Sequence, residues 1–283
     1  MKLEEIGVVG CGLMGSGIAE TCARAGYKVV VREIDDELLQ KGLDRIQQSL
    51  SKAVARGKAT HEEAEQAFAR IQGTLDLADL GGCDLVVEAA VENMGIKKEI
   101  FAQLDSILPS HAILASNTSS LCVTEMASVT QREDKVLGIH FFNPVPVMPL
   151  IEFVRTILTS DETMAVVQEF GASLGKTMVT AKDTPGFVVN RLLIPYLLDA
   201  VRIYEDGLAS REDIDTAIKL GLNHPMGPLT LLDFVGLDTC LFISDAMYEE
   251  YKDPRFAAPP LLRRMVVAGR LGRKSGQGFY DYS

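Results

Sequence analysis

The stretch Ile6-Gly7-Val8-Val9-Gly10-Cys11-Gly12-Leu13-Met14-Gly15 decides the fold at the start of this chain. Its first four residues form an apolar run typical of a buried β-strand, and its glycines have the GxGxxG spacing. We expect Gly10 to make the tight turn after the strand, Gly12 to let a pyrophosphate approach, and Gly15 to let the next helix pack closely. Because a helix N-terminus favours phosphate, the stretch predicts a dinucleotide site in a parallel α/β sheet.

The chain beyond this motif continues as a dinucleotide fold requires. A helix is predicted up to Gly26, and residues 27–31 are predicted to form the second strand. Glu33 follows that strand, 18 residues after Gly15, where an acid would bind the adenosine ribose hydroxyls. A carboxylate there repels a 2′-phosphate and so favours NAD over NADP, whereas the neighbouring Arg32 leaves NADP open.

A second informative stretch, HFFNPVPVMPLIE, spans residues 140–152. The apolar run 136–139 predicts a buried strand that ends at His140, and three prolines then exclude regular structure for several residues. A further apolar run from Leu150 brings Glu152 back toward the same place. An imidazole beside a carboxylate suits general acid/base chemistry, although a hydrogen-bonded structural histidine gives the same pattern. The dinucleotide motif in the same domain favours the acid/base interpretation.

Two more strands are predicted in the interior of the sheet. Residues 83–89 show no alternation of apolar and polar side chains, as expected where both faces are buried, and residues 113–115 form the next strand. Loops 89–93 and 116–120 follow these strands at the carboxyl edge, where open α/β sheets bind ligands. The hydroxyls and the amide of 116–120 can contact a ligand or simply cap the following helix.

A helix pair at about residues 36–70 is longer than an ordinary crossover connection, and we expect it to protrude from the sheet. It comprises a polar helical stretch from Asp35 to Ala55, a break at Gly57 and a second helix from about Thr60 to Arg70. Three cations lie along it, at Lys52, Arg56 and Lys58. They can contact phosphates or form an ordinary solvated face, and the pattern leaves both interpretations open.

A boundary is predicted near residues 182–186, which divides the chain into 1–184 and 185–283. The first part is expected to be an α/β, Rossmann-type doubly wound domain. The second is expected to be all-helical, because it shows no strand-like alternation. Its helices are predicted at 187–204, 229–251 and 260–268. These helices are too apolar for surface elements, so we expect this domain to form a homodimer interface besides serving the substrate.

Composition favours a cytoplasmic enzyme. The chain has 283 residues, 47% of them hydrophobic, and no apolar stretch approaches the roughly 20 residues that span a membrane. The first strand begins by Ile6, so no signal or transit peptide is expected. The five cysteines lack CxxC spacing and are expected to be apolar fillers in a reducing compartment. A net charge of −11 argues against nucleic acid as a partner, and an anionic ligand would need a local basic patch.

Seven islands of sequence together resemble the 3-hydroxyacyl-CoA dehydrogenase family, in its short single-function form. They occur in order over essentially the whole chain, as an accidental resemblance would not. The islands are GCGLMGSGIA at 10–19, VVEAAVEN at 86–93, ASNTSSL at 115–121, HFFNPVPVM at 140–148, DTPGFVVNRLL at 183–193, NHPMGPL at 223–229 and LGRKSGQGFYDY at 271–282.

The resemblance implies reversible NAD-dependent oxidation of a short-chain 3-hydroxyacyl-CoA, above all 3-hydroxybutyryl-CoA, to the 3-ketoacyl-CoA. His140 matches the catalytic general acid/base, and Glu152 matches the carboxylate that orients its imidazole and stabilises the charged form. Ser119 matches a hydroxyl that hydrogen-bonds the reacting oxygen, and Asn190 matches an amide that contacts the substrate carbonyl. No metal is expected, because hydrogen bonds can polarise that oxygen while the cofactor takes the hydride.

The resemblance also implies a larger set of binding residues. On the cofactor side they are Gly10, Gly12, Leu13, Met14, Gly15, Glu33, Ala90, Glu92, Lys97, Ser119, Asn143 and Lys274. On the CoA side they are Ser49, Lys52, Arg56, Ser119 and Asn190. The contacts on the helix pair are expected to close over bound ligand.

The sequence departs from the family pattern at two positions, and several alternative functions stay open. Glu33 occupies a position where many relatives have Asp, and Pro149 one where relatives usually have Lys, which removes a charge and a backbone donor. Acyl chain length, direction and pathway, whether fatty-acid breakdown or butanoate synthesis, stay open. The alternatives are a 3-hydroxyadipyl-CoA dehydrogenase, a sugar-acid dehydrogenase of the lambda-crystallin-like branch, and a non-catalytic structural or NAD-sensing protein.

Overall fold

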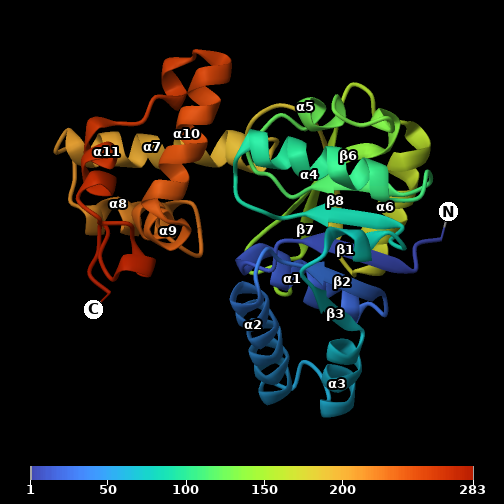
Figure 1. Cartoon of the computed structure of the whole chain (residues 1–283). Helices are drawn as coiled ribbons and strands as arrows, with labels where there is room; N and C mark the ends of the chain where they lie inside the picture. Colours follow the sequence, from blue (N-terminus) through green and yellow to red (C-terminus); the bar gives the residue numbers. More distant parts are fainter. Residues whose placement is uncertain (1, 283) are drawn as a thin grey trace. The chain divides into compact units, whose positions relative to one another are not determined.

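The computed structural model describes residues 2–282, and the chain divides into two compact units, Met1–Thr184 and Pro185–Ser283. The first unit is a sheet covered by helices, and the second is built from helices (Figure 1). These two architectures confirm the predicted fold class, a Rossmann-type doubly wound sheet followed by an all-helical domain.

The sheet of the first unit has eight strands in the order β3-β2-β1-β4-β5-β6-β7-β8. The strands are β1 (Glu5–Val9), β2 (Lys28–Arg32), β3 (Ile71–Thr74), β4 (Leu85–Glu88), β5 (Ile113–Ser116), β6 (Val136–Phe141), β7 (Leu150–Arg155) and β8 (Thr177–Lys182). Strands β1 to β6 are parallel, whereas β7 is antiparallel to β6 and β8 is parallel to β7. The strand order reverses between β1 and β4, so the loops that follow these two strands meet at the topological switch point.

Helices of the first unit connect these strands. They are α1 (Leu13–Arg24), α2 (Asp36–Ala55), α3 (His61–Ala69), α4 (Met94–Ile107), α5 (Val123–Ala127) and α6 (Asp161–Ser173), with 3₁₀ turns η1 (Leu77–Leu80) and η2 (Glu133–Lys135). Asp35 caps α2, Thr60 and Glu63 form a capping box on α3, and Gly57 turns the chain between them with a φ of 66°. Helices α2 and α3 extend past the β3 edge of the sheet (Figure 1).

The interior strands are buried on both faces, which explains their unbroken apolar sequences. Every residue of β4, β5 and β6 is buried. Leu85, Ile113 and Leu137 belong to one apolar cluster that also includes Ile18 of α1 and Phe170 of α6. Burial of this area is the main force that holds the helices on the sheet. The strands predicted at 83–89, 113–115 and 136–139 are therefore confirmed.

The two edge strands were not predicted as strands from the sequence. β3 has the sequence IQGT, and β8 has the sequence TMVTAK with mostly exposed or half-buried side chains. An edge strand packs on fewer neighbours, so it needs no continuous apolar run, and its pairing partner supplies the order. Main-chain pairing to β2 and to β7 respectively holds them in the sheet.

The second unit contains five α-helices among residues 185–282. They are α7 (Val189–Glu205), α8 (Arg211–Gly221), α9 (Pro228–Val235), α10 (Leu237–Tyr251) and α11 (Pro260–Val267), with 3₁₀ turns η3 (Pro254–Phe256) and η4 (Arg273–Ser275). The helical stretch predicted at 229–251 is divided by Gly236, whose φ of 103° breaks it into α9 and α10. Leu198, Leu232 and Met247 lie in the core of this unit. Across the described chain, no helix is both long and apolar enough to cross a membrane.

Candidate active site

His140 and Glu152 form a buried pair at the carboxyl end of β6. They are register partners across the antiparallel strands β6 and β7, and His140 Nδ1 lies 2.7 Å from Glu152 Oε2. The imidazole is 5% exposed and the carboxylate is fully buried. Because a carboxylate oxygen accepts hydrogen bonds, Nδ1 is the donor of this contact, and in the neutral imidazole Nε2 then presents its lone pair. Nε2 lies 3.0 Å from Ser119 Oγ, so a basic nitrogen faces a hydroxyl at the sheet edge.

The loop that carries Ser119 is held by the carboxylate of Glu92. Glu92 Oε1 accepts hydrogen bonds from Thr118 Oγ1 at 2.5 Å and from Ser119 N at 3.1 Å. Asn117 ties the same loop to β6, because its Oδ1 accepts from Phe141 N at 2.9 Å. The sequence left two interpretations of this loop open, and the structure places its hydroxyl directly against the imidazole.

Lys97 lies beneath this loop and is buried, with 1% of its side chain exposed. Its ammonium is 2.7 Å from Glu88 Oε1 and 3.3 Å from Glu92 Oε2. Glu88 is fully buried at the end of β4, and it also accepts from Ala90 N at 2.7 Å and from Ser116 Oγ at 2.6 Å. These contacts join the three charges in one group of hydrogen bonds and ion pairs at the carboxyl ends of β4 and β5.

The glycine loop after β1 has the geometry that its sequence predicts. Gly10 has a φ of 93°, and a Cβ built on Gly15 would lie 1.8 Å from Gly10 O. Apart from its two chain neighbours, no heavy atom of residues 2–282 lies within 4 Å of a Cβ built on Gly12, which is exposed. Leu13 beside it is 60% exposed at the start of α1. Gly10 and Gly15 therefore serve the fold, whereas the open space at Gly12 is available to a ligand.

Glu33 lies after β2 and contacts the glycine loop directly. Its Oε1 accepts from Cys11 N at 2.8 Å, and its Oε2 accepts from Ile34 N at 2.8 Å. Met14 is half-buried in the same region, in the first turn of α1. Glu33, which is predicted to bind the adenosine ribose, thus contacts the glycine loop that is predicted to bind the pyrophosphate.

The residues predicted to contact CoA on the helix pair all lie on or at the end of α2. Lys52 and Arg56 are exposed, and Ser49 is half-buried. Ser49 faces Glu20 of α1, a side chain with only 2% exposure. Burial raises the pKa of Glu20, and the Ser49 hydroxyl and the Arg24 guanidinium oppose that rise. The two exposed cations are accessible to an anion, while the half-buried serine faces α1.

Three more predicted residues lie in a loop of the first unit and in the second unit. Asn143 is exposed in the loop between β6 and β7, which also contains the cis peptide bond Asn143–Pro144. Asn190 is buried in the first turn of α7, and Lys274 pairs with Asp238 at 2.6 Å; both belong to the second unit. The described geometry of the first unit therefore groups His140, Glu152 and Ser119.

Lys274 is held in a terminal segment that folds back on α9. Asp233, buried at the end of α9, accepts from Phe279 N at 2.8 Å and from Tyr280 N at 2.9 Å. Burial raises the pKa of Asp233, and these hydrogen bonds oppose the rise. The anchor explains how residues near the chain end keep a defined position.

Two carboxylates that position the site were not selected from the sequence. Glu88 ends an otherwise apolar buried strand. A charged residue in such a run could have indicated a functional carboxylate. Asp183 accepts from Val123 N at 3.0 Å and from Thr124 N at 2.6 Å, and so anchors the chain just after the Ser119 loop. Asp183 could have been selected because it is the first residue of the DTPGFVVNRLL island at 183–193.

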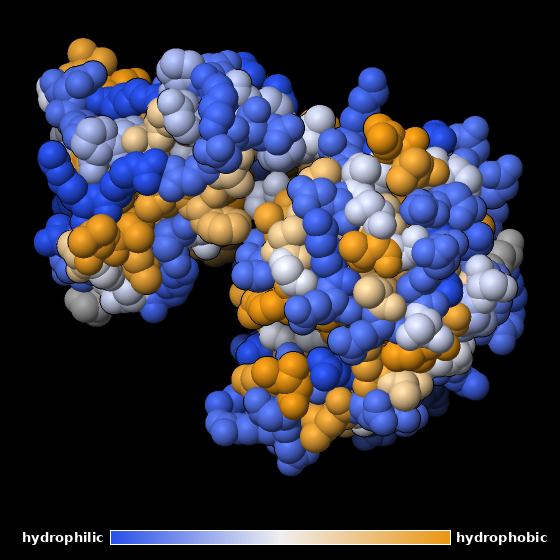
Figure 2. All heavy atoms as spheres, turned by 45° about the horizontal axis from the view of Figure 1, so that its top comes forward, coloured by the Kyte–Doolittle hydropathy of each residue, from blue (hydrophilic) through white to orange (hydrophobic). Residues whose placement is uncertain are grey.

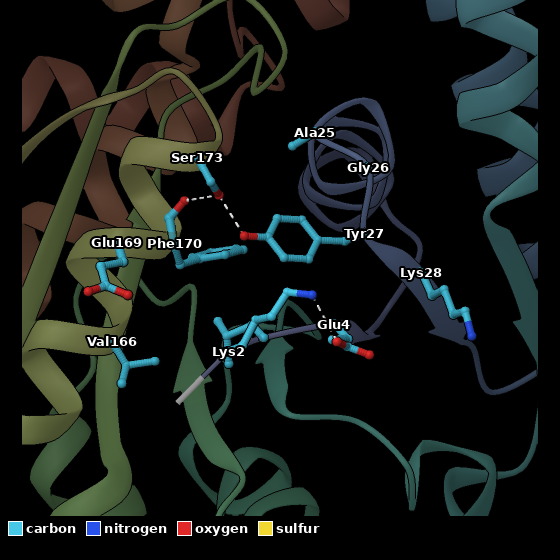
Figure 3. Close-up of a pocket in the computed structure, with 11 residues that line it drawn as sticks. Lys2, Glu4, Ala25, Gly26, Tyr27, Lys28, Val166, Glu169, Phe170 and Ser173 are labelled. Atoms are coloured by element: carbon cyan, nitrogen blue, oxygen red, sulfur yellow. Dashed lines mark hydrogen bonds and ion pairs between the residues drawn. The ribbon is translucent and has the colours of Figure 1, made fainter.

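A separate cavity of about 580 Å³ lies at the other edge of the sheet (Figure 3). Lys2 and Glu4, which precede β1, line it together with Tyr27 and Phe170, whose ring centroids are 5.6 Å apart. The Tyr27 hydroxyl is 2.6 Å from Ser173 Oγ. Lys2, Glu4 and Tyr27 lie at the amino ends of β1 and β2, whereas His140 lies near the carboxyl end of β6, so the cavity is not part of the site around His140.

Comparison with known proteins agrees with this geometry. The family model for the 3-hydroxyacyl-CoA dehydrogenase NAD binding domain matches residues 5–184, and the model for the C-terminal domain of the same family matches residues 186–282. A 3-hydroxybutyryl-CoA dehydrogenase of Mycobacterium tuberculosis is 52% identical over 282 residues, which cover 99% of each chain.

Solved structures show the same relationship. FadB2 of M. tuberculosis has a TM-score of 0.99 and 51% identity, with all of both chains covered. The (S)-3-hydroxybutyryl-CoA dehydrogenase of Ralstonia eutropha has a TM-score of 0.96 and 46% identity, again with all of both chains covered. Both units of this chain thus match both domains of one enzyme family. The chain belongs to the 3-hydroxyacyl-CoA dehydrogenase family and is an NAD-dependent oxidoreductase.

Proposed function

We propose that this protein reversibly oxidises a short-chain 3-hydroxyacyl-CoA, with 3-hydroxybutyryl-CoA as its main substrate, to the 3-ketoacyl-CoA. The observation that carries the proposal is the line of hydrogen bonds from Ser119 Oγ through His140 to Glu152. The names of its relatives in M. tuberculosis and R. eutropha support the choice of substrate.

The residues present fit NAD. Gly12 leaves open space beside the N-terminus of α1, where a pyrophosphate can approach backbone N–H groups. Glu33 offers a carboxylate to ribose hydroxyls next to that loop. When bound, NAD supplies the hydride acceptor for oxidation, and NADH supplies the donor for reduction. Gly10, Leu13, Met14, Gly15, Ala90, Glu92, Lys97, Asn143 and Lys274 complete the proposed cofactor set, in part by supporting their neighbours.

His140 moves the proton in this proposal. In oxidation, Nε2 takes the proton of the substrate 3-hydroxyl while the C3–H bond breaks, and in reduction it returns that proton to the forming alcohol. Glu152 keeps Nδ1 protonated and stabilises the imidazolium that forms. The Ser119 hydroxyl, 3.0 Å from Nε2, donates to the reacting oxygen and so fixes it in front of the imidazole.

The remaining proposed contacts concern the thioester and CoA. Asn190 offers its amide to the thioester carbonyl, and its place in the PGFVVNR island supports that assignment. Lys52 and Arg56 are exposed cations on an otherwise acidic protein, and they suit the CoA phosphates, with Ser49 as a hydroxyl partner. These two local positive charges offset the long-range repulsion of an anionic ligand that is expected from a net charge of −11.

We also propose that the second domain, 185–283, forms a homodimer. Apolar side chains lie at the surface of the second unit (Figure 2). The most exposed are Leu192, Leu208, Leu220, Leu222 and Val267. A contiguous contact that covers such residues is typical of a self-complementary interface. Light scattering after size exclusion should give twice the chain mass of 30.8 kDa; a monomer at micromolar concentration would contradict this part of the proposal.

The test of the function is NADH oxidation at 340 nm with acetoacetyl-CoA, run beside NADPH and beside free acetoacetate. We expect turnover that requires both NADH and the CoA ester. Activity on the free acid alone would assign the protein to the sugar-acid branch. A folded protein that binds NADH but turns over none of these substrates would support the sensing or structural alternative.

Chain length is tested in the same assay. Ketoacyl-CoA substrates of increasing length, and one with a terminal carboxylate, are compared by kcat/KM. A maximum at four carbons supports 3-hydroxybutyryl-CoA, and a maximum with the dicarboxylic substrate would replace it with 3-hydroxyadipyl-CoA.

A further inference from the structure

We propose that Glu88 is a positioning residue for the reaction, which acts through Lys97 and Glu92 to hold Ser119 against His140. The inference rests on the proposed function, and it adds a residue that touches neither the reacting oxygen nor the imidazole.

Glu88 is placed to organise both strands that end at the site. It is the last residue of β4 and is fully buried, yet three donors meet its carboxylate. Ala90 N and Lys97 Nζ donate to Oε1, each at 2.7 Å, and Ser116 Oγ donates to Oε2 at 2.6 Å. A buried charge persists in this way only where opposite charge and hydrogen bonds compensate it.

The first route from Glu88 to Ser119 passes through charged groups. Lys97 Nζ bridges to Glu92 Oε2 at 3.3 Å. The other oxygen of Glu92 accepts from Thr118 Oγ1 and from Ser119 N. Two carboxylates thus share one ammonium, and the position of Lys97 between them sets where Glu92 can hold the loop.

The second route passes along β5. Ser116 Oγ, which donates to Glu88, also accepts from Thr118 N at 3.2 Å. The main chain takes part as well, because Asn117 N donates to Glu88 O at 2.8 Å. Both routes converge on residues 116–119, so a change at Glu88 displaces the loop from two sides.

Lys97 is better explained by this role than by direct contact with the cofactor. Its side chain is 1% exposed, and both of its carboxylate partners lie within 3.3 Å. A group so enclosed acts through its neighbours. An error of about 1 Å in the placement of Ser119 is enough to cost on the order of 10²-fold in rate.

The experiment compares Glu88→Gln, Lys97→Met and Ser116→Ala with a matched control, Asp105→Asn. Asp105 pairs with Arg132 at 2.7 Å in a largely buried contact at the start of β5, away from the loop. Ser116→Ala removes one donor to Glu88 without leaving a buried charge unpaired. It therefore tests the proposal even if Glu88→Gln and Lys97→Met fold poorly. Each variant is measured for kcat, KM, NADH affinity by fluorescence, and thermal melting.

We expect Glu88→Gln to lower kcat about 10- to 100-fold while KM for acetoacetyl-CoA and the affinity for NADH change less than about threefold. Ser116→Ala should lower kcat by a smaller factor. Asp105→Asn should lower the melting temperature and leave kcat unchanged. If Glu88→Gln behaves like Asp105→Asn, the pair with Lys97 is structural only and the proposal is wrong. A large loss of NADH affinity in Lys97→Met with unchanged kcat would instead assign Lys97 to the cofactor.

A readout that needs no turnover separates this inference from the proposed function. The chain has four histidines, so the His140 imidazole signals can be assigned by NMR from their loss in His140→Gln. Glu88→Gln and Ser116→Ala should shift these signals, because Ser119 moves relative to Nε2, and Asp105→Asn should not. Unshifted signals would overturn the inference even if the wild-type enzyme is active, and shifted signals would sustain it even if acetoacetyl-CoA is not the substrate.

Discussion

Glu152 stands directly opposite His140 across the antiparallel strands β6 and β7, with its Oε2 2.7 Å from the imidazole Nδ1. Strand register decides this relationship, because a slip of one residue would turn either side chain to the other face of the sheet. The loop between the two strands is fastened as well, since Lys176 Nζ donates to Val145 O and Met148 O, each at 2.7 Å.

Glu152→Gln should lower kcat by about 10²-fold, within the range that general acid/base catalysis contributes. The amide keeps the shape and one acceptor, but it no longer stabilises an imidazolium. NADH affinity should stay within about threefold of wild type. Steady-state kinetics with acetoacetyl-CoA measure the change, and a kcat equal to wild type would show that the pair is structural.

Gly15→Ala should lower the stability of the fold, whereas Gly12→Ala should lower the affinity for NADH. A methyl group at Gly15 would lie 1.8 Å from Gly10 O, so this variant should unfold at a lower temperature or fail to fold. At Gly12, whose φ is −66°, the methyl group meets no described atom within 4 Å beyond its two chain neighbours, and the melting temperature should stay near wild type. NADH affinity should nevertheless fall at least tenfold, because the methyl group occupies space needed by the pyrophosphate. Unchanged affinity in Gly12→Ala would place the cofactor elsewhere.

Glu33→Gln should reduce the preference for NADH over NADPH about tenfold. The amide oxygen can still accept from Cys11 N, so the glycine loop keeps its support, while the hydrogen bond from Ile34 N and the charge that repels a 2′-phosphate are removed. The neighbouring Arg32 then remains as a cation on the same strand. The ratio of kcat/KM for the two cofactors measures the effect, and Glu65→Gln, at an exposed position on α3, is the control.

Glu20→Gln should stabilise the protein at neutral pH and not at acidic pH. Burial raises the pKa of Glu20 above its ordinary value of 4.5, so the folded chain binds this proton more tightly than the unfolded chain does. Stability is therefore lost as the pH rises from 4.5 through the raised pKa, and the glutamine variant avoids that loss. We expect a gain of about 1 kcal/mol at pH 7.5, because glutamine buries no charge at this position, where Glu20 Oε1 has the Arg24 guanidinium 3.6 Å away and no hydrogen-bond partner among the described residues.

Thermal melts at pH 7.5 and near pH 4.5 measure the effect. Arg24, Lys176 and Ser49 are the groups that face this carboxylate, and they stay in place in the variant. Equal melting temperatures of the variant and wild type at both pH values would contradict the assignment.

Much of the fold follows from local sequence signals. The GxGxxG loop, the break at Gly57 and the unbroken apolar runs of β4 to β6 each depend on a few neighbouring residues, and each was predicted at the right place. The edge strands β3 and β8 were not, because their order comes from pairing with a neighbour rather than from their own composition. The division at Gly236 was not predicted either, because the helical sequence pattern continues across it, whereas its φ of 103° separates α9 from α10.

The sequence by itself determined which residue types the chain contains for this chemistry and roughly where they fall: His140 and Glu152 on neighbouring runs, and Ser119 in a loop after a strand. Only the tertiary structure decided that these three side chains meet within hydrogen-bond distance, and that Glu88, Lys97 and Glu92 hold the serine loop from below. The physical reason is that periodicity reports burial along one strand. The distance between side chains on different strands depends on register and pairing, which arise when the whole sheet forms.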